Sequence, residues 1–181
     1  YDPEDTVNVP LAKNMAERVE GLVGVAAPNI IGKGIPERIK ELETKYGKLD
    51  WRVALEISLE TSQGKFCTFG TQKVAMETGI RVGLAYLTLG VVASPLEGFV
   101  ELKIRKRKDG KEYLALMYSG PIRSAGGTAG SVSVIIADYI RKKMGYSAYD
   151  PSEKETKRMA RELYDYHERV TNLQYLPSEK E

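Results

Sequence analysis

Apolar residues recur every three or four positions through much of the first 95 residues, the spacing of a buried helical face. The first stripe follows Pro10, which suits the first turn of a helix, and Gly47 stops the second. Asp50 is placed to cap a third helix over residues 50–63. The two stripes consist of Leu11, Met15, Val19, Leu22 and Val23, and of Ile35, Ile39, Leu42 and Tyr46.

Residues 71–95 form the most apolar segment of the chain, and residues 82–93 carry no charge. A membrane-spanning helix needs roughly 20 apolar residues, so the pattern predicts a buried core helix that ends at Pro95, and no membrane partner.

Strict alternation replaces the helical spacing at about residues 98–118 and predicts a β-hairpin. Asp109 and Gly110 fit the two central positions of a type I′ turn. The second strand, residues 113–118, is apolar on both faces, which predicts a helix or strand over its outer side. The expected cross-strand pairs are Arg107 with Glu112, Ile104 with Ala115, and Leu102 with Met117, and the expected inner face of the first strand is Val100, Leu102 and Ile104.

A glycine-paired loop after Tyr118 leads into a helix that ends at Gly145. Unpaired N–H groups at a helix start can hold an anion, and Gly126, Gly127 and Thr128, with Arg123 beside them, are the candidates for this role. The alternative is a tight turn in which glycines let strand and helix pack closely. The expected buried stripe is Val132, Ile135, Ile136, Tyr139, Ile140 and Met144, followed by the cations Arg141, Lys142 and Lys143.

A charged helix closes the chain, with Asp150 as expected N-cap, Pro151 in the first turn and Glu153 completing a capping box. Its narrow apolar stripe has coiled-coil spacing, so we expect one partner helix from this domain, from further chain, or from a second copy in a homodimer. We divide the chain into a helical domain with the hairpin, 1–150, and this helix with its tail, 151–181. The stripe is Thr156, Met159, Leu163, Tyr166, Val170 and Leu173.

Composition and motifs indicate little chemistry. The chain has 42% hydrophobic and 29% charged residues and a net charge of +2, and its single cysteine excludes a disulfide framework and a cysteine zinc site. We interpret Cys67 as a buried apolar residue and His167 as a solvated surface residue. No nucleotide-binding, zinc-protease or hydrolase motif and no metal-binding carboxylate cluster occurs, so we expect no catalytic residue and no cofactor here. We expect no signal peptide, because the opening residues have no basic segment and no apolar core, and the first residue, a tyrosine, suggests a piece of a longer protein.

The clearest indication of a function is a cluster of basic residues. Five cations lie at the hairpin tip with Tyr113 nearby, and such a ribbon can neutralise the phosphates of a nucleic acid with an affinity that falls steeply with salt. The alternative is a turn kept soluble by its charge. The five are Arg105, Lys106, Arg107, Lys108 and Lys111.

Longer stretches resemble the amino-terminal region of the large subunit of archaeal family D DNA polymerase. They are RVGLAYLTLGVVASPLEG (81–98) and KDGKEYLALMYSGPIRSAGGTAGSVSVIIADYIRKKMG (108–145), with PLAKNMAERVEGLVG (10–24) and DWRVALEI (50–57) also similar. The resemblance implies a DNA-directed DNA polymerase that works with a smaller exonuclease subunit. It also implies catalytic aspartates, magnesium and cysteine zinc sites well downstream of these residues, so no active-site role is carried over.

We therefore expect an α+β, helix-dominated domain from an archaeal, intracellular (cytoplasmic) replicative polymerase. Its expected role is assembly and DNA contact, while catalysis occurs elsewhere. The first alternative is a pure scaffold that packs on the polymerase core or the small subunit and does not touch DNA. The second is an independent phosphate-binding enzyme that uses the glycine loop.

Overall fold

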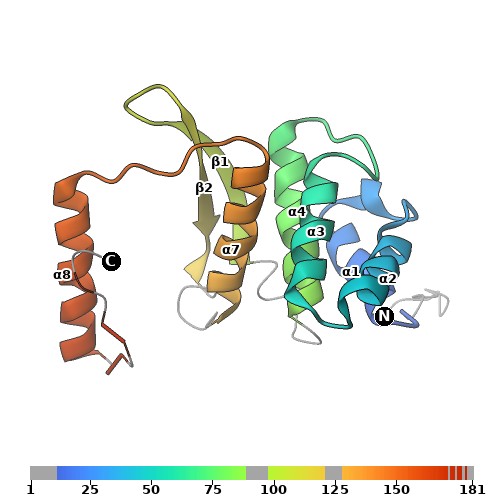
Figure 1. Ribbon diagram of the computed structural model, residues 1–181, viewed down its shortest axis with the longest axis horizontal. Helices are drawn as coiled ribbons and strands as arrows, with labels where there is room; N and C mark the ends of the chain where they lie inside the picture. Colours follow the sequence, from blue (N-terminus) through green and yellow to red (C-terminus); the bar gives the residue numbers. More distant parts are fainter. Residues whose placement is uncertain are drawn as a thin grey trace, which may run out of the picture. The chain divides into compact units, whose positions relative to one another are not determined.

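The computed structural model describes residues 12–88, 98–120, 128–170, 172–173, 175–176 and 178. The chain divides into two compact units, residues 1–147 and residues 148–181, each with its own internal contacts. Figure 1 shows the elements of both units along the chain.

The first unit contains five α-helices, one short 3-10 helix and one β-hairpin among its described residues. The α+β, helix-dominated class expected from the sequence is confirmed. Its elements are α1 (Met15–Gly24), the 3-10 helix Pro28–Ile30, α2 (Ile35–Tyr46), α3 (Trp51–Ser62), α4 (Gln72–Leu87), β1 (Phe99–Lys106), β2 (Glu112–Tyr118) and α7 (Thr128–Lys143).

Polar side chains set where these helices begin. Asp50 caps α3 as expected, since its carboxylate accepts a hydrogen bond from the Arg52 N–H at 2.8 Å. The start expected at Pro10 lies outside the described residues, and residues 12–14 are not helical. α1 instead begins at Met15, because the Asn14 side chain accepts from the Glu17 N–H.

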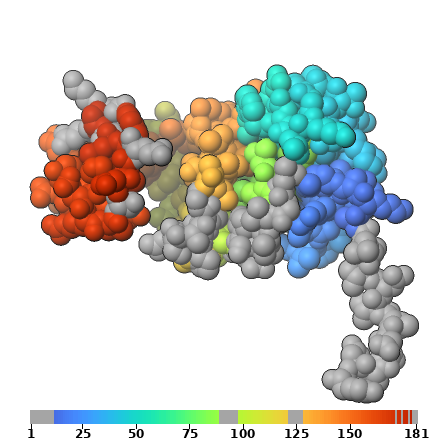
Figure 2. Space-filling model, turned by 90° about the horizontal axis from the view of Figure 1, so that it is seen from below, coloured from blue at the N-terminus to red at the C-terminus, as the bar shows by residue number. Residues whose placement is uncertain are grey.

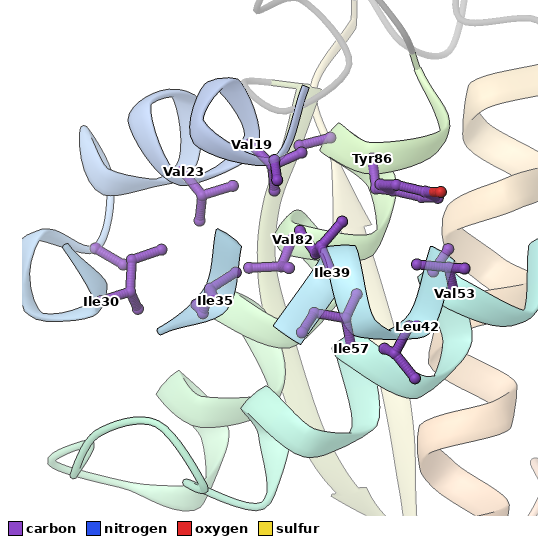
Figure 3. Packing of buried hydrophobic residues seen from close by; sticks show 14 residues of the cluster. Val19, Val23, Ile30, Ile35, Ile39, Leu42, Val53, Ile57, Val82 and Tyr86 are labelled. Atoms are coloured by element: carbon purple, nitrogen blue, oxygen red, sulfur yellow. The ribbon is translucent and has the colours of Figure 1, made fainter. Parts of the chain in front are cut away.

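Two hydrophobic clusters form the core of the first unit. One joins α1, the 3-10 helix and α2 to α3 and α4, and Figure 3 shows its side chains pointing toward one another. The other joins α3 and α4 to β1 and α7. It contains Leu55, Met76, Ile80, Leu84, Phe99, Leu102, Ile136, Ala137 and Ile140.

α3 and α4 contribute to both clusters, and their own contact is unusually close. Gly79 and Gly83 of α4 face Ser58 and Ser62 of α3. The Ser58 hydroxyl donates to the Ala54 carbonyl at 2.6 Å, so a buried serine can lie against a glycine without an unpaired polar atom. A Cβ on either glycine would lie closer than 3.0 Å to atoms of α3.

A buried carboxylate joins α2 to the end of α3. Glu60 is 6% exposed and accepts from Arg38 Nε and a second Arg38 nitrogen, both at 2.8 Å. Burial alone raises the pKa of Glu60, but the hydrogen bonds from Arg38 and Lys65 outweigh it and hold that pKa below its ordinary value. Glu60 is therefore ionised and tied to the cation of α2.

The hairpin register differs by one residue from the expected one. Its loop has three residues, because the Arg107 N–H donates to the Lys111 carbonyl at 2.8 Å and only Gly110 has a positive φ, +81°. This is a type I turn followed by a left-handed glycine, not a type I′ turn. The pairs are therefore Lys106 with Glu112, Ile104 with Leu114, and Leu102 with Leu116, in place of the expected ones.

This shift reverses the faces of β2. Leu114, Leu116 and Tyr118 pack on the second cluster, while Ala115 and Met117 lie opposite Lys103 and Glu101. Of the helix or strand expected over this side of β2, the described residues show a helix, because α7 contributes to the same cluster and the sheet has two strands.

Two apolar residues expected inside are exposed. Val100 is 51% exposed because the register shifts between Phe99 and Glu101, which turns it outward. Ile135 of α7 is 60% exposed because Ile136, Ala137 and Ile140 make the contact face. α7 ends as expected, with Gly145 at φ +80°.

The second unit consists chiefly of α8 (Glu153–Arg169). Its N-cap is Ser152 and not Asp150, because Ser152 and Glu155 form a reciprocal capping box in which each side chain accepts from the other's backbone N–H. The helix stops before Val170, so Leu173 lies beyond it, and the Leu173 N–H donates to His167 Nδ1 at 3.0 Å. His167 is therefore partly enclosed on a helix that has no buried residue, and it is less solvated than the sequence interpretation assumed.

Cys67 is half-buried against the first cluster, less enclosed than expected, and burial raises the pKa of its thiol. Among the described residues no helix combines the length and hydropathy that crossing a membrane requires.

We predict that Gly79→Ala destabilises the chain by about 2 kcal/mol, because the new methyl group must push apart two helices that are both buried on several sides. Gly21→Ala is the matched control. Gly21 lies inside α1 with nothing within 4 Å of its Cβ position, so alanine should raise stability by about 0.5 kcal/mol. Denaturant unfolding measures both, and equal effects of the two variants would contradict the close approach.

Candidate nucleic-acid interface

The hairpin tip extends past the ends of the neighbouring helices α4 and α7 (Figure 1). Its position depends on α4, whose side chains bond the backbone of β1. Glu77 Oε1 accepts from the Leu102 N–H at 2.7 Å, and an Arg81 nitrogen donates to the carbonyls of Phe99 and Val100 at 3.1 and 3.0 Å. The Arg81 guanidinium also lies 4.8 Å from the centre of the Phe99 ring. The base of the hairpin is thus held rigidly.

The observed register determines which cations share a face. Arg105 pairs with Tyr113, and Arg107 is bonded to Lys111 across the loop. Opposite residues of an antiparallel pair point to the same side, so these four residues line one face of the tip. Lys106 pairs with Glu112 and lies on the other face.

The tip carries five cations against two carboxylates, Asp109 and Glu112. Asp109 lies 3.2 Å from Arg107 Nε and 3.7 Å from Lys111 Nζ. The Lys111 N–H that it accepts, and then these two cations, lower the pKa of Asp109, so it stays ionised. In the ranges that the structure describes, Arg105, Lys106 and Lys108 make no ion pair, and they are exposed.

The predicted anion loop falls largely outside the described residues, which exclude Arg123, Gly126 and Gly127; Thr128 is the first residue of α7. Beside it, the Tyr118 and Ser133 hydroxyls lie 2.6 Å apart, and Ser133 donates to the Gly130 carbonyl at 2.7 Å. These contacts fix the end of β2 to the start of α7. Anion binding at this loop stays a prediction.

Most of the predicted interface residues on α8 are exposed within their unit. Met159 is 56%, Tyr166 46% and Val170 67% exposed, and no residue of α8 is buried. A groove of about 660 Å³ runs along this helix and is lined in part by Tyr149, Met159 and Leu163.

Charged side chains of α8 form ion pairs with each other along the helix. Lys157 lies 2.6 Å from Glu153, and Arg158 lies 2.7 Å from Glu162. Such pairs leave the apolar stripe as the side of α8 that lacks a helix partner among the described residues of this unit.

Residues 45–52 stand out in the sequence only as a helix boundary. The structure exposes Trp51, the single tryptophan, to 61% in that turn, beside Lys45, Lys48 and Arg52. An aromatic residue among cations is the signal that could have identified it.

The part of the chain that the structure describes brings together no group of three or more His, Cys, Asp or Glu side chains able to hold a metal ion. The magnesium and zinc that the resemblance implies have no donor set among these residues, and no reaction step is derived through them.

The fold and the tip define a helix-dominated α+β domain with a projecting cationic hairpin. The family model described as "DNA polymerase II large subunit DP2, N-terminal" matches residues 1–181, and the chain belongs to this family. The family resemblance seen in the sequence is therefore confirmed.

Curated relatives agree with the family match. The chain is 50% identical over 181 residues to the DNA polymerase II large subunit of Nanoarchaeum equitans and 46% identical over 181 residues to that of Methanococcus maripaludis. It is 45% identical over 182 residues to that of Thermococcus kodakarensis. These alignments cover 100%, 100% and 99% of the chain but 15%, 15% and 10% of the three relatives.

Proposed function

We propose that this chain is a non-catalytic domain of a replicative DNA polymerase large subunit that contacts DNA through its hairpin tip and serves assembly through α8. The longer protein would supply polymerase activity, with magnesium and zinc bound elsewhere and a smaller exonuclease subunit as partner. The supporting observation is the group of exposed cations, Arg105, Lys106 and Lys108, on a hairpin whose base is held by α4.

Phosphate contact fits this tip for two reasons. Flexible side chains on a rigid ribbon can neutralise phosphates without a fixed sequence, and the release of counterions then favours binding. Tyr113 lies opposite Arg105 on the same face, where its ring could pack on a sugar or base.

A scaffold role without DNA contact is the second candidate. The exposed stripe of α8 favours it, because a helix with a narrow apolar stripe usually pairs with one other helix. Its occupant would be a second copy, further chain, or the smaller subunit.

Replacing Arg105, Lys106 and Lys108 by alanine should weaken binding to duplex DNA about tenfold at low salt. The slope of log affinity against log salt should flatten by about one unit for each phosphate that the tip no longer neutralises. A mobility-shift titration at several salt concentrations measures both. Alanine at Lys154, Lys157 and Arg161 of α8 removes the same charge and is the matched control.

Asp109→Asn should act in the opposite direction, because it keeps a side chain suited to the turn but frees Arg107 and Lys111 from their carboxylate. Tighter binding with a steeper salt slope is expected, and the same titration measures it. If neither this variant nor the triple alanine variant changes DNA binding, the tip is only a solvated turn.

A second copy is one of the partners that the stripe on α8 could take, and this homodimer can be tested directly. The double variant Leu163→Asp and Val170→Asp should convert a dimer into a folded monomer, because each aspartate would place a charge in the apolar seam. Light scattering and circular dichroism follow mass and fold. Tyr164→Asp, which is off the stripe, should leave the dimer intact, and a monomeric parent chain at high micromolar concentration would rule the homodimer out.

The chain alone should neither extend a primer nor degrade DNA with magnesium or manganese present, because its described residues gather no metal-binding carboxylates. A primer-extension gel measures this. Incorporation that copurifies with the chain through several columns would contradict the proposal.

A further inference from the structure

The turn between α2 and α3, residues 45–52, is a second surface that combines cations with an exposed aromatic ring. Its most exposed large apolar side chain is Trp51, at 61%, and Leu49 beside it is 49% exposed. The same turn carries three cations, Lys45, Lys48 and Arg52. Asp50 is the one carboxylate within the turn.

The backbone of this turn is held in place from the core. Leu49 has a φ of +63°, the single non-glycine residue with a positive φ in the described ranges. Its N–H donates at 2.9 Å to the hydroxyl of Tyr86, whose side chain is fully buried. That hydroxyl donates in turn to Glu43 Oε1 at 2.9 Å. A non-glycine residue keeps this conformation only where its surroundings enforce it, so the turn is preorganised.

The carboxylate of the turn is already engaged. Arg52 binds Asp50 with two nitrogens at 2.9 and 2.8 Å, and its guanidinium lies 4.9 Å from the centre of the Tyr46 ring. Lys45 Nζ lies 4.7 Å from the same ring. Lys45 and Lys48 make no ion pair within the described part of the chain. Two positive charges of the turn are thus available to an anion.

We propose that the α2–α3 turn is a stacking site for a single-stranded nucleic acid. An unpaired base would stack on the Trp51 indole while Lys45 and Lys48 neutralise the adjacent phosphates. This inference rests on the proposed function, because it takes DNA as the partner. The surface is different from the hairpin tip.

The charge of the turn favours a polyanion over a protein partner. A protein anchor usually lies at the centre of an apolar patch ringed by other contacts, whereas the apolar exposure here is limited to Trp51 and Leu49, in a turn with three cations and one carboxylate. Single strands fit better than duplex, because only an unpaired base offers its face to the indole.

Because the chain has a single tryptophan, its fluorescence reports on the α2–α3 turn alone. Titrating the chain with an oligothymidylate of about 12 nucleotides should quench Trp51 emission, since a stacked base is in direct contact with the ring. A duplex of equal length should quench it less at equal saturation. Anisotropy of a labelled oligothymidylate gives the affinity of variants that lack tryptophan.

Trp51→Ala should weaken oligothymidylate binding about tenfold, and Trp51→Phe, which keeps an aromatic face, should stay within about threefold. Val25→Ala is the matched control, because Val25 is 86% exposed and lies outside the turn. Circular dichroism should show all three folded, since each site is on the surface.

The outcomes separate the two proposals. Binding that depends on the hairpin cations, without quenching and with unchanged affinity in Trp51→Ala, would overturn the stacking site and leave the proposed function standing. No binding of any DNA would overturn both. A blue shift of Trp51 emission with rising protein concentration, independent of DNA, would mean that the turn packs against another copy and would also overturn the stacking site.

Discussion

The close contact of α3 with α4 is the constraint on which the first unit depends. Serines on one helix meet glycines on the other, at positions four residues apart on each, so the two backbones come nearer than side chains normally allow. Because both helices contribute to two clusters, each cluster is built on one side of this pair. Figure 2 shows the residues of α3 next to those of α4. A change that separates α3 from α4 would therefore disturb both clusters at once.

The orientation of the hairpin tip and of the α2–α3 turn depends on α4, one helix of that pair. Along α4, Glu77 and Arg81 bond the backbone of β1, and further along the same helix Tyr86 bonds the Leu49 N–H. One buried helix thus orients the cationic hairpin and the α2–α3 turn. The hairpin and the α2–α3 turn are both held in place by hydrogen bonds to side chains of α4, so neither depends on a large hydrophobic core of its own.

Much of the fold could be predicted from the sequence where one local signal acted alone. Gly47 and Gly145 ended their helices and Asp50 capped α3, since each effect operates within a turn of backbone. Errors arose where two local signals competed. Asp109–Gly110 suits both two-residue and three-residue loops, and both Asp150 and Ser152 can cap a helix; the reciprocal bond with Glu155 decided the latter.

The candidate sites were less predictable. A sequence shows that cations cluster at residues 105–111, but only the register shows that Arg105 and Arg107 share a face with Tyr113. The α2–α3 turn could not be predicted in this detail from spacing, because the positive φ of Leu49 is stabilised by a hydrogen bond to a buried tyrosine 37 residues away.

A two-stranded sheet has two edges, and unpaired edges invite other strands. One edge of this sheet is occupied by Glu77 and Arg81, which use the N–H of Leu102 and the carbonyls of Phe99 and Val100. At the other, the Ser147 N–H donates to the Glu112 carbonyl at 2.8 Å, beside a parallel bridge to Tyr113. Backbone groups on both edges of the hairpin therefore already have partners, which disfavours pairing with a strand of another molecule and growth of a fibril from this ribbon.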